Sequence, residues 1–151
     1  MDHCAVSQLF FCEKYRVPPE QTARHLFGRL PHGKGYADRM VDAMATGYLV
    51  SVLESICARE LQPLLDRDEE TVVGSSVQFR HRAPIAPNTL IKVDGFIIGI
   101  GDREATFLVR ASDDHEIVCE GEIRFAVVRR AQMDERIQRK CRLNECVETV
   151  A

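Results

Sequence analysis

The sequence predicts an α+β fold in which an antiparallel sheet wraps around one long central helix. Two observations lead to this prediction. Residues 38–65 contain no proline before Pro63 and space their apolar residues as a buried helix does. Four later segments alternate in the period of a strand, and short turns join them. A sheet of consecutive strands has one face to cover, and the helix is the only long apolar element available.

The composition is that of one ordinary domain. The chain has 151 residues, of which 45% are hydrophobic and 28% charged, and 20 Lys+Arg against 23 Asp+Glu give a net charge of −3. A chain of this length buries a sizeable core without a metal or a disulfide framework. The weak net charge argues against a nucleic-acid partner, and no segment approaches the ~20 apolar residues of a membrane span. We therefore treat residues 1–151 as one domain, expected to be cytoplasmic.

The six cysteines are expected to remain reduced thiols. They stand at positions 4, 12, 57, 119, 141 and 146, without a C-x-x-C pair. Cys57 and Cys119 fall in apolar segments and are expected to be small core residues. Because His3, His25 and His32 lack a spacing at which ligands converge, we expect neither a metal nor another cofactor.

The first part of the chain predicts a strand followed by a cover. An apolar cluster at 9–11 marks a candidate first strand, and Pro18 and Pro19 end it. A short helix is expected within 20–27. Glycine and proline dominate the rest of the segment 20–38, which is therefore expected to be a lid rather than a core element.

The central helix has its apolar stripe at Leu49, Val52, Leu53 and Ile56. Further apolar residues widen this stripe, so the helix should be buried on most sides. Strands are predicted over 73–83, 89–100, 104–111 and 117–128. A polar helix over 132–143, within the C-terminal helix and tail 129–151, completes the chain. A sheet wrapped around one helix in this way is the hotdog architecture.

In the strand at 73–83, period-two alternation places His81 on the face toward the helix, together with Val73, Ser75, Val77 and Phe79. Gly74 is predicted to lie on the opposite face.

Thr46, Glu54 and His81 are the candidate catalytic residues. Thr46 stands at the start of the apolar part of the helix, and Glu54 follows eight residues later, about two turns along. A half-buried carboxylate opposite an imidazole is typical of an acid–base site. Simpler interpretations remain open at this point. Thr46 serves equally well as a helix N-cap, Glu54 as a solvated side chain beside Ser51 and Ser55, and His81 as a strand terminus.

The sequence resembles the fluoroacetyl-CoA thioesterase-like branch of the hotdog proteins. The resemblance rests on 17–19 (VPP), 45–50 (ATGYLV) with Leu53-Glu54, and Gly74 followed seven residues later by His81. It runs in order over residues 10–140, and the spacing of these motifs makes it specific.

The resemblance implies a homodimer whose two sheets join edge to edge, with an acyl-CoA or acyl-carrier-protein thioester bound near the interface. It also implies thioester hydrolysis by Thr46, Glu54 and His81. Either Thr46 or Glu54 is the attacking or water-activating group, and His81 is the base and then the acid. Gly74 is implied at the substrate site, with Gly47 beside it.

The lid before the helix departs from the family pattern. The specialised family member carries phenylalanines there, whereas this chain has Ala37 and Met40, with Tyr36 adjacent. We expect Tyr36 and Met40 to contact the substrate. Fluoroacetyl and a different, larger acyl group are both open alternatives for the acyl part. The alternative function is a non-catalytic module that binds an acyl-CoA or acyl-carrier-protein thioester, because a fold does not fix reactivity.

Overall fold

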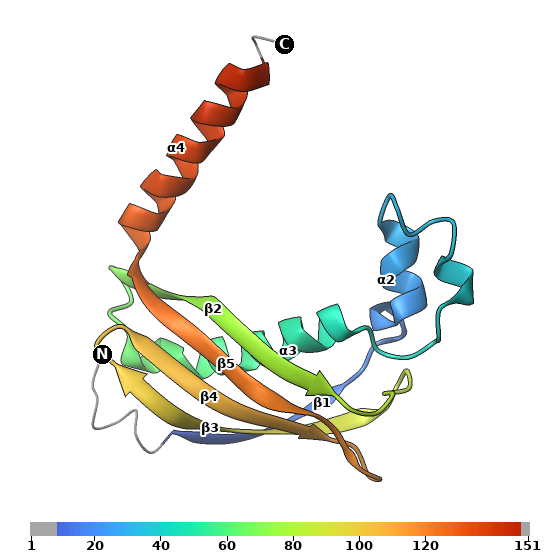
Figure 1. Ribbon diagram of the computed structural model, residues 1–151. Coiled ribbons are helices and arrows are strands. Elements are labelled where there is room, and N and C mark those ends of the chain that lie inside the picture. The colour runs from blue at the N-terminus through green and yellow to red at the C-terminus, as the bar shows by residue number, and fades with distance from the viewer. Residues whose placement is uncertain (1–8, 149–151) are drawn as a thin grey trace.

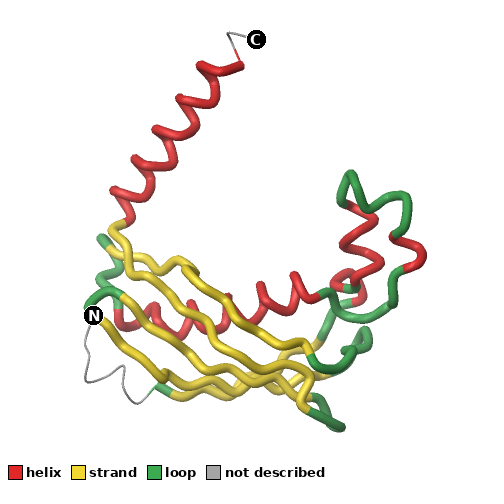
Figure 2. The backbone as a smooth tube through the Cα atoms, viewed as in Figure 1, coloured by secondary structure: helices red, strands yellow, loops and turns green. Residues whose placement is uncertain are grey.

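The computed structural model describes the backbone of residues 9–148 and the side chains of residues 9–143. Its centre is one five-stranded antiparallel sheet with the strand order β1-β3-β4-β5-β2 (Figure 1). The strands are β1 (Phe10–Arg16), β2 (Glu70–His81), β3 (Leu90–Gly101), β4 (Glu104–Ser112) and β5 (Ile117–Arg129). Helix α3 (Thr46–Leu61) crosses one face of the curved sheet (Figures 1 and 2). The predicted α+β fold, a sheet wrapped around a central helix, is confirmed.

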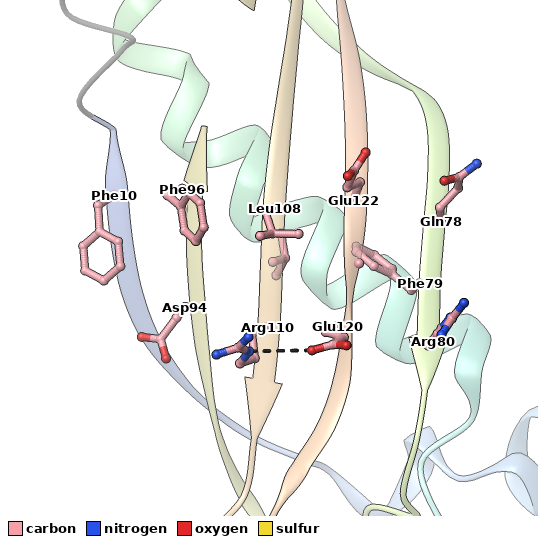
Figure 3. Close-up of a pocket in the computed structure, with 12 residues that line it drawn as sticks. Phe10, Gln78, Phe79, Arg80, Asp94, Phe96, Leu108, Arg110, Glu120 and Glu122 are labelled. Carbon is pink, nitrogen blue, oxygen red and sulfur yellow. Dashed lines mark ion pairs between the residues drawn. The ribbon is translucent and has the colours of Figure 1, made fainter. Parts of the chain in front are cut away.

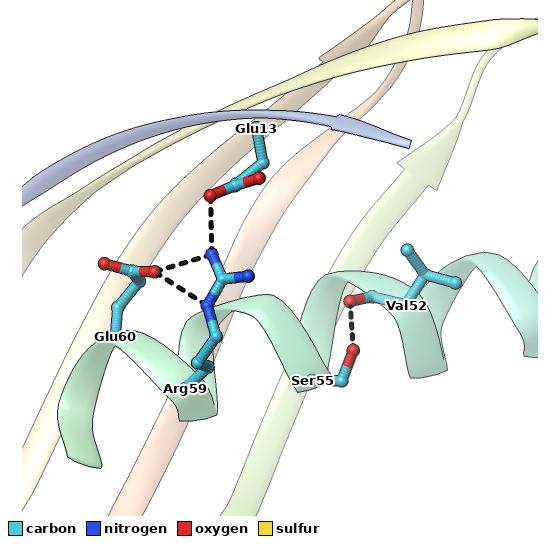
Figure 4. Close-up of polar contacts among 5 residues, drawn as sticks. All are labelled: Glu13, Val52, Ser55, Arg59 and Glu60. Atoms are coloured by element: carbon cyan, nitrogen blue, oxygen red, sulfur yellow. Dashed lines mark hydrogen bonds and ion pairs between the residues drawn. The ribbon is translucent and has the colours of Figure 1, made fainter. Parts of the chain in front are cut away.

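Helix α3 is buried along the predicted stripe. Leu49 and Leu53 are each 1% exposed and Leu61 is fully buried. The helix is shorter than residues 38–65, because Ala45, its N-cap, has extended backbone angles and Gln62–Leu64 tighten into a 3-10 turn. Arg59 near its C-terminal end reaches Glu13 of β1 at 2.7 Å, which ties the helix to the sheet edge (Figure 4).

The core between α3 and the sheet is built on three phenylalanines. Phe107 of β4 is fully buried, with its ring centroid 5.9 Å from that of Phe11 and 6.2 Å from that of Phe125. The predicted core cysteines, Cys57 and Cys119, are buried free thiols. Cys4 and Cys146 lie outside the residues whose side chains are described.

Strand β2 differs from the prediction at one point. A bulge between Gly74 and Ser76 breaks its register with β5, and the Ser75 hydroxyl donates to the Arg124 carbonyl oxygen at 3.1 Å. Because one extra residue reverses the alternation, Gly74 faces α3 together with His81. The prediction that Gly74 lies on the opposite face is therefore wrong, as is the placing of Val73 and Ser75 on the inner face.

The segments outside the sheet form two projections. The expected lid contains α2 (Ala23–Arg29), preceded by a 3-10 turn, and a second 3-10 turn at Ala37–Arg39. Helix α4 (Arg130–Glu148) is longer than the predicted 132–143 and extends away from the sheet (Figure 1). Among the described residues, no helix is both long and apolar enough to cross a membrane.

We expect Phe107→Ala to destabilise the protein by about 3–5 kcal/mol, because it leaves a cavity beneath two other rings. The measurement is urea unfolding followed by circular dichroism. Phe96→Ala is the matched control: this ring lies on the neighbouring strand but is 44% exposed, so its removal should cost less than about 1 kcal/mol. Equal losses in the two variants would contradict the assignment of Phe107 to the core.

Candidate active site

The start of α3 brings two of the predicted residues together. Thr46 is the first residue of the helix, and its hydroxyl oxygen lies 3.0 Å from Nδ1 of His81, the last residue of β2. Ala45, not Thr46, occupies the N-cap position. The interpretation of Thr46 as an N-cap is therefore wrong, and its hydroxyl is directed to the imidazole.

The helix start also supplies unpaired backbone donors. The first helical hydrogen bond runs from the N–H of Leu49 to the Ala45 carbonyl oxygen, at 3.0 Å. The preceding N–H groups, those of Thr46, Gly47 and Tyr48, therefore have no acceptor within the helix. Together with the positive end of the helix dipole, they form a suitable site for a developing oxyanion.

His81 is half-buried, and its second ring nitrogen, Nε2, is buried without a partner among the described residues. Burial lowers the pKa of His81 from its usual value near 6.5, and a hydrogen bond with the backbone of Ala83 opposes this effect. The lowered pKa favours the neutral imidazole. If Thr46 donates to Nδ1, the histidine acts as a base toward the hydroxyl.

An apolar pocket of about 530 Å³ opens beside the Thr46–His81 pair. The segment 20–38 contributes Leu26 and Phe27, and the loop before α3 contributes Met40, Val41 and Met44. The lining also includes Gly47 and Arg82, and Arg82 is paired with Glu120 outside the pocket. Of the expected substrate-contacting residues, Met40 and Gly47 therefore lie in this pocket.

Tyr36 does not line the pocket. It is 44% exposed, and its ring lies against Phe27 with a centroid separation of 6.0 Å. Sequence reasoning did not single out Phe27, although an adjacent Leu-Phe pair in a segment otherwise rich in polar residues, glycine and proline was an available signal.

Glu54 lies elsewhere along the helix, against Gly74. A side chain at Gly74 would displace the Glu54 carboxylate from its present position against the strand. The half-buried Glu54 thus faces the sheet, whereas Ser51 and Ser55 bond back to their own helix. Within one chain, however, Glu54 is eight residues or about 12 Å along the helix axis from Thr46. The structure therefore contains two separate pairs, Thr46–His81 and Glu54–Gly74.

A larger hollow of about 830 Å³ lies on the opposite face of the sheet. Figure 3 shows its side chains with α3 behind the strands. It contains none of the predicted site residues, and Arg110 in its floor is 3.8 Å from Glu120. Among the described residues, no group of three His, Cys, Asp or Glu side chains could hold a metal ion.

Comparison with known proteins identifies the family. Residues 32–131 match the family described as fluoroacetyl-CoA-specific thioesterase, FlK. The fluoroacetyl-CoA thioesterase of Streptantibioticus cattleyicolor is 25% identical over 130 residues, which cover 86% of this chain and 90% of that protein.

Solved structures agree in fold. A phenylalanine-to-alanine mutant of the fluoroacetyl-CoA-specific thioesterase FlK, in complex with fluoroacetate and CoA, has a TM-score of 0.75 and 26% identity, covering 83% of this chain and 96% of that chain. A thioesterase superfamily member from Thermus thermophilus has a TM-score of 0.78 at 19% identity, covering 91% and 94%. The chain therefore belongs to the fluoroacetyl-CoA-specific thioesterase family, a family of hotdog enzymes that hydrolyse thioesters.

Proposed function

We propose that this protein hydrolyses an acyl-CoA thioester to a free acid and CoA, with Thr46, His81 and Glu54 as its catalytic residues. The observation that carries the proposal is the Thr46–His81 pair, which joins an activated hydroxyl to the mouth of an apolar pocket and to free helix N–H groups. The activity of the family, with the S. cattleyicolor thioesterase as an example, supports the same assignment.

The active protein is proposed to be a homodimer joined along β2. This strand is one of the two edges of the sheet, so within the described residues one side of its backbone has no neighbouring strand. Both polar pairs lie beside β2, because His81 and Gly74 belong to it. Pairing β2 with its copy about a two-fold axis brings the Glu54–Gly74 pair of one protomer toward the Thr46–His81 pair of the other.

The proposed chemistry follows from the roles of these groups. The thioester carbonyl oxygen accepts hydrogen bonds from N–H groups at the start of α3. Either the Thr46 hydroxyl or a water molecule oriented by Glu54 attacks the carbonyl carbon, and His81 takes the proton of the attacking group. The carbon–sulfur bond then breaks, and the same imidazole returns the proton to the CoA thiolate. If Thr46 attacks, water hydrolyses the resulting acyl ester by the same path.

We expect Glu54→Gln and His81→Ala each to lower kcat for thiol release from acyl-CoA by about 100-fold or more, since the first removes the carboxylate that orients water and the second removes the proton carrier. The control is Glu60→Gln on the same helix, whose carboxylate binds Arg59 and not the site; it should retain normal turnover. Light scattering after size exclusion checks that all variants stay dimeric. Saturable acyl-CoA binding without thiol release by the parent protein would instead favour the non-catalytic binding module.

The pH dependence of kcat/KM should follow the deprotonation of the His81 imidazole. A base must be deprotonated to act, so kcat/KM is expected to fall as the pH drops through the pKa of His81, which burial holds below 6.5. As the pH rises above 6.5, the rate should become insensitive to this group. The measurement is kcat/KM between pH 5 and 8, compared with the NMR titration of His81. An acidic limb centred above pH 6.5 would contradict the role.

The pocket should favour uncharged acyl groups. Its lining beside Thr46 is mainly aliphatic and aromatic, and its one charged residue, Arg82, already has a carboxylate partner. Because an unpaired carboxylate is costly to bury, we expect kcat/KM for pentanoyl-CoA to exceed that for glutaryl-CoA, a five-carbon acyl group with a terminal charge, by more than tenfold. Faster hydrolysis of glutaryl-CoA would contradict this account of the pocket.

A further inference from the structure

A second, basic hollow lies where α4 leaves the sheet. It has a volume of about 560 Å³. Three arginines from three parts of the fold line it: Arg103 from the turn between β3 and β4, Arg129 from the end of β5 and Arg136 from α4. Gln132 adds a polar side chain, and no acidic residue belongs to the lining.

The charges of these arginines are not neutralised within the described part of the chain. Its ion pairs involve Lys92 and other arginines, and none joins a carboxylate to the three that line the hollow. Arg103 is held in place because its Nε donates to the Val127 carbonyl oxygen at 2.9 Å, which leaves its two terminal nitrogens for a ligand. Guanidinium groups bind phosphate oxygens in a bidentate manner, so this hollow suits a ligand with several phosphates.

The hollow is too far from the catalytic pair of its own chain to serve the same substrate. Arg129 is the register partner of Glu70 at one end of β2, whereas His81 stands at the other end. Eleven residue steps of roughly 3.3 Å separate these ends, or about 36 Å. The pantetheine arm of CoA, between the thioester and the diphosphate, has about the length of four or five extended residues, or about 15 Å.

When β2 pairs with its copy about a two-fold axis, the two strands run antiparallel. The hollow of one protomer then lies near the catalytic pair of the other, within reach of one CoA molecule. The Glu70 end of one strand then lies beside the His81 end of its copy, and β5 of the first protomer is about two strand spacings, or about 10 Å, from that copy. Arg129 follows the alternation of Phe125 and Val127 and shares the inner face with them. His81 lies on the same face. A two-fold axis perpendicular to the sheet leaves this face on the same side in both protomers. Helix α4 rises from the end of the sheet at which β2 begins (Figure 1).

We infer that the hollow formed by Arg103, Arg129 and Arg136 binds the 3′-phosphate and diphosphate groups of a CoA thioester whose acyl end lies in the partner's Thr46 site. The inference rests on the proposed function and specifies its substrate as a CoA thioester rather than a carrier-protein thioester. It also gives α4 a role. The family match ends at residue 131, so Arg136 stands beyond the part of the chain that defines the family.

The first test measures binding without catalysis. Adenosine 3′,5′-bisphosphate is titrated calorimetrically into the full-length protein and into the double variant Arg129→Gln/Arg136→Gln. We expect the double variant to bind at least tenfold more weakly, because two charge-assisted contacts are lost. Arg139→Gln is the control, since Arg139 lies on the same helix but outside the hollow, and it should bind normally. Equal affinities in all three proteins would overturn the inference.

The second test compares substrates with and without the nucleotide. The ratio of kcat/KM for an acyl-CoA to kcat/KM for the same acyl group on N-acetylcysteamine should fall about tenfold in the double variant and stay at the parent value in Arg139→Gln. If no thioester is hydrolysed while the bisphosphate still binds through the arginines, the proposed function fails and the anion site stands. Normal hydrolysis with an unchanged ratio overturns the anion site and leaves the proposed function intact.

The third test asks whether the hollow acts across the dimer. A protomer with Thr46→Ala and a protomer with the double arginine change are co-expressed with different tags, and the heterodimer is purified. If the hollow serves the partner's site, one of the two sites is complete, and acyl-CoA turnover regains the parent KM. If it serves its own chain, neither site is complete and turnover stays low, which overturns the inference.

Discussion

Burial of α3 against the curved sheet is the constraint on which the rest of the molecule depends. The helix has almost no exposed surface at Leu49, Leu53 and Leu61. Because successive residues turn by 100°, rotating the helix by a single residue would expose this stripe and lose several kcal/mol of apolar burial. The burial therefore fixes where Thr46 and Glu54 point, although neither residue contributes to the core.

The position of the lid is held mainly by backbone contacts at its two ends, rather than by packing among its own side chains. Thr22 caps α2 by accepting from the His25 N–H at 3.3 Å and forms a bridge with Met44. The N–H of Met44 in turn donates to the Ile85 carbonyl oxygen at 2.8 Å. The two ends of the lid are thus joined to each other and to the loop after β2. These backbone contacts hold the side of the pocket near His81, whereas its outer rim consists of short segments.

The sequence was sufficient to predict the helix and the four later strands because burial imposes a period on apolar residues. It was insufficient for the bulge, since an extra residue in β2 changes neither composition nor local propensity, and the register depends on contacts with β5. The length of α4 was underestimated because a polar helix without a buried face has no apolar period. Alternation placed His81 on the face toward the helix, but the contact of His81 with Thr46 and the separation of Glu54 from both became visible only in three dimensions.

For the lid as well, the sequence predicts one part of the arrangement and only the structure shows the rest. Its position before α3 follows from glycine and proline content, but the residues that close the pocket come from two short segments brought together by the Thr22–Met44 bridge. Such a contact between segments over twenty residues apart leaves no periodic signal. Met40 was expected at the pocket from its place in the sequence, whereas Tyr36, four residues earlier, turns outward onto Phe27.

The bulge in β2 also determines which kinds of genetic change the protein tolerates. Gly74 and His81 are seven residues apart, an odd number that would place them on opposite faces of a regular strand. The additional residue at the bulge turns both toward α3. Replacing Ser75 by another residue removes only one hydroxyl contact, whereas deleting it would turn either the glycine or the histidine away from the helix. Along this stretch, substitutions are therefore tolerated during evolution, whereas insertions and deletions are not.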